Sequence, residues 1–288
     1  MNLRKRNLFL VVFGCIAVAL AVTGKSVTAQ GTSAAGGLSA ETIFLKRFSS
    51  EESKKLIRLY QDQYEVYRQT ERDFTTLQAQ YLQLGTLASL ESAVVSSRAI
   101  MLVRTDVLIT YHELLAATLV ESIGVELELK QDTLGQLQQS IEDLKNIRVE
   151  IAASNDRFAI GAVNSTFEEE LVPQLYSVAY KTLSQLVVSD LQNVFDKTKQ
   201  VYAELKTELT AKEVTKLQLE ERARAYTEVD AAIAAVEVQL AAITAEVKTE
   251  EKFDERFYQQ LVDKLQKVYG GLSQIMTYIE ELERTSHE

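Results

Sequence analysis

The stretch that decides the fold is MLVRTDVLITYHELLAATLV, residues 101–120, which is mostly apolar but contains Arg104, Asp106, His112 and Glu113. Its length suits either a membrane span or a buried helix. An arginine or aspartate at the centre of a membrane span costs about 2.5–3.5 kcal/mol on insertion scales. Because several ionisable residues interrupt this stretch, the sequence predicts the central helix of a bundle, contacted by neighbours on several sides.

The polar residues of this helix fall on two stripes. Arg98, Thr105 and His112 follow one another at intervals of seven residues, and Asp106 and Glu113 share a different face. A ligand pocket would have to use the first stripe, so Arg98, Thr105 and His112 are the candidate ligand-binding residues. We expect instead that Arg98 and His112 satisfy polar groups between helices. The acidic face is predicted to be a solvated edge, because neither acid has a histidine three residues on, as carboxylate metal sites in bundles do.

Two other roles for polar residues of this helix can be weighed. Catalysis through His112 would need a nucleophile, and the chain has no G-x-S-x-G motif. Arg104 faces the side opposite the His112 stripe, near Tyr111 and Leu115. We expect it to pair with a carboxylate on another helix or to extend along the surface to solvent.

Composition favours helices along the whole chain. Proline occurs once and glycine 11 times in 288 residues. No segment shows the alternation of apolar and polar residues that is typical of a strand. Tyr60, Tyr67, Phe74 and Tyr81 recur every seven residues; such a series could stack on sugars or bases, but beside leucines it favours helix packing. The predicted fold is all-α: an elongated multi-helix bundle with long helices and a C-terminal antiparallel coiled-coil hairpin.

The helix boundaries of the bundle, residues 49–210, are predicted from turn residues. The first helix ends near Gly85, and the second covers about 87–130, where KQDTLGQ marks its end. A third helix starts at Asp132 or Thr133.

The clearest predicted loop is SNDRFAIGAVNST, residues 154–166. Thr166 and Glu169 have capping-box spacing and would open a fourth helix that reaches about 209. Pro173 lies early in this helix, where the helix either starts late or kinks.

Residues 211–288 are predicted to form the coiled-coil hairpin, with its turn near 249–253. Apolar residues alternate at intervals of three and four along both arms, and alanines accompany the first series. We expect the hairpin to project from the bundle and carry a partner-binding surface; it could instead pack on the bundle or close a homodimer. The two series are Tyr226, Val229, Ile233, Val236, Leu240, Ile243 and Val247, and Leu261, Leu265, Val268, Leu272, Ile275, Ile279 and Leu282.

The N-terminal segment, residues 1–29, has the basic, apolar and small-residue regions of a secretory signal peptide. Cleavage is expected between Ala29 and Gln30; an uncleaved membrane anchor and a lipoprotein site at Cys15 are the alternatives. Residues 30–48 read as a flexible tether. All three alternatives predict an exported, extracytoplasmic protein.

Two segments carry a resemblance to known proteins. Together with the signal-like start, YQDQYEVYRQTERDF (60–74) and RTDVLITYHELLAATL (104–119) resemble uncharacterised exported all-helical proteins of ultra-small candidate-phylum bacteria. The resemblance covers residues 50–205. It implies export and an all-helical fold, and it brings no functional residues, since that family has no assigned activity.

Charge and missing motifs narrow the function. A formal net charge of −10 disfavours nucleic acid as a partner, and a membrane is expected to contact only the N-terminal segment, if that is retained. No cofactor, metal or enzymatic activity is predicted. The leading hypothesis is a non-catalytic helical protein of envelope structure or protein interaction. The alternatives are a small-molecule-binding bundle and a secreted helical pore-forming protein.

Overall fold

The computed structural model describes residues 51–210 and 216–284; 93% of these residues are helical, and none is in a strand. The all-α, multi-helix prediction is therefore confirmed. The predicted signal peptide (1–29), its cleavage site at Ala29 and Gln30, and the tether (30–48) lie outside the described residues. The chain divides into two units, Met1–Lys54 and Lys55–Glu288, and nearly all of the described residues belong to the second unit.

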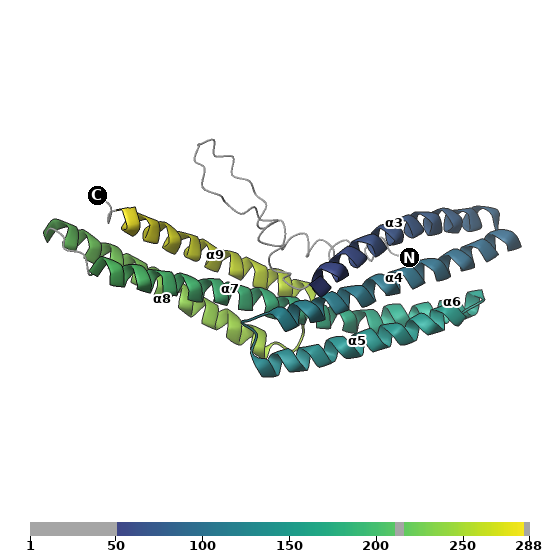
Figure 1. Ribbon diagram of the computed structural model, residues 1–288. Helices are drawn as coiled ribbons and strands as arrows, with labels where there is room; N and C mark the ends of the chain where they lie inside the picture. The colour runs from purple at the N-terminus through teal and green to yellow at the C-terminus, as the bar shows by residue number, and fades with distance from the viewer. Residues whose placement is uncertain (1–50, 211–215, 285–288) are drawn as a thin grey trace. The chain divides into compact units, whose positions relative to one another are not determined.

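The described residues form six long helices and two short segments, and all but the first four of these residues belong to the second unit (Figure 1). A π-helical segment, labelled η1, joins α6 to α7. The elements are α3 (Glu51–Leu84), α4 (Leu87–Glu121), α5 (Leu127–Ala153), α6 (Arg157–Ser165), η1 (Thr166–Leu171), α7 (Val172–Thr210), α8 (Lys216–Thr249) and α9 (Glu255–Arg284).

The predicted end of the first helix near Gly85 is confirmed, because α3 stops at Leu84. Gly85 has a φ of +60°, and its N–H donates to the Tyr81 carbonyl, so it ends the helix in the left-handed conformation that glycine adopts easily. Thr86 then caps α4, since its side chain accepts from the Ser89 N–H and Ser89 returns a bond to Thr86. The chain reverses within two residues.

The prediction for the end of the second helix is wrong, because the helix stops earlier. α4 ends at Glu121 and α5 begins at Leu127, so KQDTLGQ lies inside α5. Gly135 of that motif has open space around it and plays no part in a turn. Gly124 is the glycine that the turn requires, because a Cβ there would lie 2.8 Å from the Ser189 carbonyl oxygen of α7.

The predicted loop 154–166 is wrong, as only residues 154–156 leave the helix. The Asp156 side chain accepts from the N–H groups of Phe158 and Ala159 and so begins α6.

Thr166 is not a helix cap. It lies within continuous helix at the start of η1, where the Val172 N–H donates to the Phe167 carbonyl five residues back. Pro173, which has no N–H to donate, follows at once, so the wide turn lies where a regular helix would lose a hydrogen bond.

The two halves of the unit share α7. It contacts α4 and α5, and it also contacts α8 and α9. The rings of Tyr202 on α7 and Tyr226 on α8 lie 6.4 Å apart, and Lys199 pairs with Glu237 at 2.8 Å. The predicted domain boundary at residue 210 therefore falls at the end of α7, and α7 packs on helices of both predicted domains.

α8 and α9 form the predicted antiparallel hairpin, joined by residues 250–254 (Figure 1). All seven seam residues of α9 are buried, as are Val229, Val236, Leu240, Ile243 and Val247 of α8. Because α7 runs along the same hairpin, the hairpin packs on the bundle rather than projecting from it alone. The Arg222 guanidinium, itself buried, donates to the Leu209 carbonyl and so caps the end of α7.

Candidate functional site

Arg98, the first candidate ligand-binding residue, holds α4 to the turn before α6. Its Nη1 donates to the Ser154 carbonyl at 3.3 Å and to the Asn155 side-chain oxygen at 3.0 Å. A guanidinium bound in this way orders the end of α5, where main-chain carbonyls lack partners within the helix. Arg98 therefore satisfies polar groups between helices, as expected.

Thr105 and His112 are both buried. The Thr105 hydroxyl donates to the Met101 carbonyl of its own helix at 2.8 Å. The His112 ring is 1% exposed; its Nδ1 lies 2.9 Å from the Leu108 carbonyl oxygen and its Nε2 lies 3.4 Å from that of Leu175 on α7. His112 thus joins α4 to α7 through main-chain carbonyls.

Burial lowers the pKa of His112, although the two carbonyl contacts act in the opposite direction. A neutral imidazole has one N–H, so it satisfies only one of the two carbonyls, and the charged ring that would satisfy both is disfavoured by the dry surroundings. The three candidate residues therefore point to three different partners: a turn, their own helix and a neighbouring helix. They do not converge on one ligand position.

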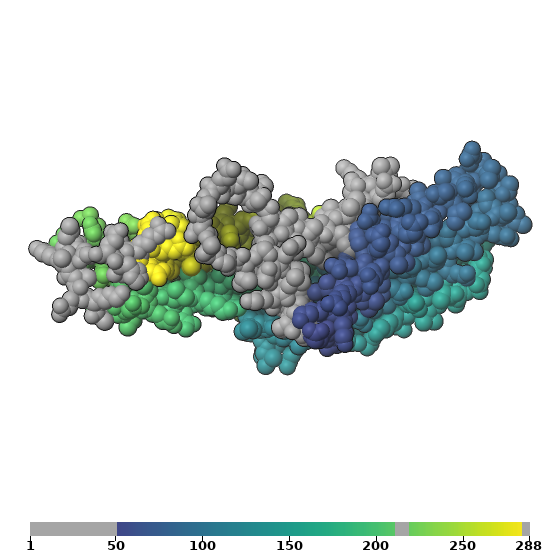
Figure 2. Space-filling view, turned by 45° about the horizontal axis from the view of Figure 1, so that its top comes forward, coloured from purple at the N-terminus to yellow at the C-terminus, as the bar shows by residue number. Residues whose placement is uncertain are grey.

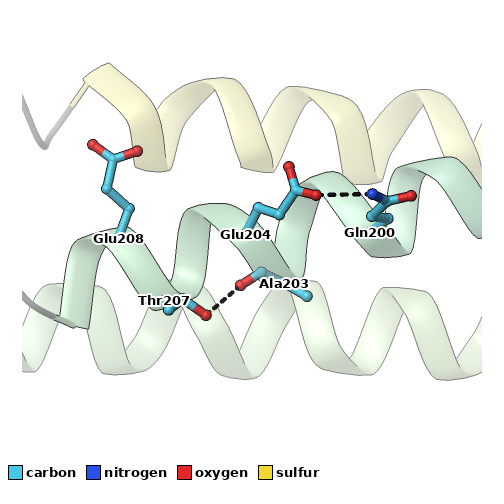
Figure 3. A pocket seen from close by; sticks show the side chains of 5 residues that line it. All are labelled: Gln200, Ala203, Glu204, Thr207 and Glu208. Carbon is cyan, nitrogen blue, oxygen red and sulfur yellow. Dashed lines mark hydrogen bonds between the residues drawn. The ribbon is translucent and has the colours of Figure 1, made fainter.

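A concavity of about 480 Å³ lies elsewhere, on the last part of α7 (Figure 3). Its lining residues all come from α7: Gln200, Ala203, Glu204, Thr207 and Glu208. The Gln200 amide donates to Glu204 at 2.8 Å, and the Thr207 hydroxyl donates to the Ala203 carbonyl. A single helix face open to solvent offers a small molecule few converging groups, so this concavity is a poor substrate site.

The polar centre of the bundle is an ion pair between Arg104 and Glu168. Both guanidinium nitrogens Nη1 and Nη2 reach the carboxylate, and the guanidinium carbon lies 4.9 Å from the centre of the Phe167 ring. The Arg104 side chain is 16% exposed and that of Glu168 is 31% exposed. The expected inter-helix partner of Arg104 is therefore Glu168, which η1 carries.

Tyrosines surround this ion pair. Tyr176 of α7 lies close to Arg104, and burial raises the pKa of Tyr176. On α3, Tyr67 is buried, and burial also raises its pKa, with the nearby Glu71 carboxylate adding to the effect. The Tyr60 ring lies 6.0 Å from that of Tyr111 on α4. Tyr60 therefore contacts α4 and Tyr67 is buried, so these two heptad rings are not an open stacking surface.

The acidic face of α4 is partly exposed, with the Asp106 side chain 33% and the Glu113 side chain 35% exposed, and both acids pair with basic residues of α5. Asp106 binds Arg148 of α5 at 2.5 Å, and Glu113 lies 3.9 Å from Lys145 of the same helix. Helix periodicity places the two acids together correctly but cannot show that α5 brings basic residues to them. Within residues 51–210 and 216–284, no group of three or more His, Cys, Asp or Glu side chains could hold a metal ion.

A second apolar face lies on α8, opposite its buried seam. Its residues recur at intervals of three and four, carry no charge and are all exposed, with Val238 71% exposed. We call them the α8 outer stripe: Ala231, Ala234, Ala235, Val238, Ala241, Ala242 and Ala245. The alanines that accompany the seam in the sequence therefore lie about half a helical turn from it, and do not flank it.

Comparison of the chain with protein-family models, with curated proteins and with solved structures finds no match. The resemblance to exported helical proteins therefore stays a prediction from the sequence. In the described part of the chain, no helix has both the length and the apolar content that crossing a membrane requires. In the part of the chain that the structure describes, all the regular elements are helical, an ion pair at Arg104 lies partly buried between helices, and α8 carries a repeating exposed apolar face.

Proposed function

We propose that this protein is an exported, non-enzymatic helical protein that acts by binding another helix, of a protein partner or of a second copy, through the α8 outer stripe. The observation that carries the proposal is the second series of apolar residues at three- and four-residue spacing, exposed on the face opposite the buried seam. One such series packs α8 on α9. A second series has the spacing that a further helix would need.

The composition of the stripe supports helix binding. Alanine side chains are short, so the backbone of another helix can approach closely, while Val238 supplies a larger apolar contact. Charged residues beside the stripe already have partners: Asp230 pairs with Lys206, Glu237 with Lys199. A helix that docks on the stripe would therefore not have to bury an unpaired charge from these two positions, which is costly.

The candidate polar residues of α4 bind other groups of the protein, and this supports a non-enzymatic role. His112 contacts two main-chain carbonyls and Arg104 is held by Glu168, so both side chains contribute to helix packing. Export rests on the sequence of residues 1–29 and its predicted cleavage after Ala29.

The proposal is tested by Ala242→Glu in the full chain, with Ala203→Glu as the matched control. Both alanines are exposed and lie within long helices, but only Ala242 belongs to the stripe. Self-association is measured by sedimentation equilibrium, and partner binding by capture from surface extracts of the native host.

We expect wild type and Ala203→Glu to hold the same partner and Ala242→Glu to lose it, with equal melting temperatures. Equal binding by all three proteins would contradict a role for the stripe.

A further inference from the structure

The turn between α3 and α4 carries little charge. Between Asp73 and Arg98 the only charged residue is Glu91, in a chain of which 25% is charged. Three leucines surround the turn, and they are strongly exposed: Leu82 at 77%, Leu84 at 61% and Leu87 at 71%. Single exposed leucines are common, but three of them within six residues at one turn are a candidate contact surface.

This turn lies beyond the neighbouring helices of the bundle. Arg98 on α4 bonds Ser154 and Asn155, so the turn before α6 is level with Arg98. The eleven residues of α4 that precede Arg98, Leu87–Ser97, continue past it by about 16 Å at 1.5 Å per residue. Figure 2 shows the two helices side by side, with their turn uncovered in this view. We call residues 74–97 the α3–α4 arm.

Part of the surface of the arm is covered. Phe74 and Tyr81, the last two members of the heptad series on α3, are half-buried, and Ala93 and Ser96 of α4 are buried. The exposed leucines at the turn are separate from these covered residues. They lie at the end of the arm rather than between its two helices.

A second copy of the chain does not suit this surface. A stable protein interface takes about 20–30 residues from each side, and the end of the arm offers roughly half that number of exposed residues before Asp73 and Glu91 are reached. A narrow convex tip also presents little area to a flat or convex protein surface. A lipid bilayer closes around a tip of any shape, and its interface takes up apolar groups to a depth of about 5–10 Å.

Charge indicates which bilayer would suit the arm. No lysine or arginine lies between Asp73 and Arg98, so the arm has nothing to attract anionic headgroups, and the chain as a whole carries −10. Uncharged leucines with half-buried Tyr81 beside them match the apolar and interfacial layers of a neutral membrane. We propose that the end of the α3–α4 arm inserts Leu82, Leu84 and Leu87 into the interface of a zwitterionic lipid bilayer, without spanning it.

The test places an environment-sensitive fluorophore at the tip of the full chain. Cys15→Ser removes the natural thiol, and Leu84→Cys provides the labelling site; a second protein carries the label at Lys252→Cys, in the exposed α8–α9 loop. Each is titrated with phosphatidylcholine vesicles. Because the label reports its own surroundings, attachment of the protein to vesicles through residues 1–29 alone would not bring the label at position 84 into apolar surroundings.

We expect a blue shift and a rise in intensity for the label at position 84, and none for the label at position 252. Adding Leu82→Glu and Leu87→Glu should raise the midpoint lipid concentration by about tenfold or more for each leucine replaced. The matched control, Ile123→Glu with Leu127→Glu, changes two exposed apolar residues of the α4–α5 turn and should leave the midpoint unchanged. Circular dichroism confirms that the variants keep their helices.

Three outcomes would overturn the proposal. The tip label could remain in a watery environment at all lipid concentrations. The shift could require anionic lipid, although the arm has no basic residue. The shift could also appear without vesicles and grow with protein concentration, which would assign the leucines to self-association. None of these results bears on the α8 outer stripe, so the two proposals fail or stand separately.

Discussion

Two adjacent glycines in α9 give a sharp test of how closely α8 and α9 pack. A Cβ added at Gly270 would have nothing within 4 Å, whereas one added at Gly271 would lie 2.7 Å from Cγ2 of Val236 on α8. Both glycines lie inside a helix, where alanine is favoured over glycine by about 1 kcal/mol. The two substitutions therefore gain the same helix propensity and differ only in what the new methyl group meets.

The expected magnitudes follow from that contact. Carbon atoms pack at about 3.5–4.0 Å, so the Gly271→Ala methyl overlaps Val236 by about 1 Å. Val236 is 3% exposed and β-branched, so it has little freedom to turn away. Overpacking of this kind costs about 1–3 kcal/mol. We expect Gly270→Ala to raise the free energy of unfolding by about 0.5–1 kcal/mol, and Gly271→Ala to leave it unchanged or lower it by up to about 2 kcal/mol.

Chemical denaturation followed by far-UV circular dichroism measures both changes. Val236→Ala removes the methyl group that the new side chain would meet, so Gly271→Ala should be better tolerated in that background than in wild type. Stabilisation of the protein by Gly271→Ala to the same extent as by Gly270→Ala would refute the close approach of α8 and α9.

Three further predictions concern the buried histidine, the ion pair and the N-terminus. Burial lowers the pKa of His112, so below about pH 6.5 the unfolded chain binds a proton that the folded chain does not. The free energy of unfolding therefore falls as the pH drops, by up to about 1.4 kcal/mol per pH unit, until the lowered pKa is reached. His112→Gln should remove that part of the slope between about pH 7.5 and pH 5.5, and an unchanged slope would show that His112 is accessible to protons. Glu168→Ala leaves Arg104 without its carboxylate in a partly buried position and should cost about 1–3 kcal/mol, whereas Glu169→Ala, at an exposed neighbour, should cost about 0.5 kcal/mol or less; equal costs would show that the pair contributes nothing. Protein from the native host should begin at Gln30 on N-terminal sequencing, and recovery of Met1 in a membrane fraction would indicate an uncleaved anchor.

The parts of the fold that depend on local spacing could be predicted from the sequence. The α9 seam from Leu261 to Leu282 is buried at every predicted position, because a regular series of threes and fours leaves only one face to bury. The end of the first helix at Gly85 is equally predictable, because no other glycine or proline lies near it in the sequence.

The errors arose where long-range packing decides the local structure. The α4–α5 turn depends on Gly124 because Ser189, far along the chain, comes within contact distance, and no local pattern shows this. Gly135 gave a stronger local signal, yet it is tolerated inside α5. η1 is similar: Thr166 has the spacing of a cap, but the helix begun by Asp156 continues through it in a wider turn before Pro173.

The candidate site was predictable only in part. The shared face of Arg98, Thr105 and His112 is evident from their spacing, but their partners lie on three different elements. Arg104 was expected to find a carboxylate, and helix periodicity alone could not identify Glu168. The alanines of α8 were visible in the sequence; their exposure required the packing of α7 and α9 to be known.

The most direct test of the proposed function is site-specific photo-crosslinking from the α8 outer stripe in the native host. A photoreactive amino acid replaces Val238, which is 71% exposed in the middle of the stripe, and in a control protein replaces Lys252 in the exposed α8–α9 loop. We expect one discrete crosslinked species from position 238, containing either a second copy or one partner protein, and none from position 252. Position 238 giving no product, or only what position 252 also gives, would contradict helix binding through the stripe.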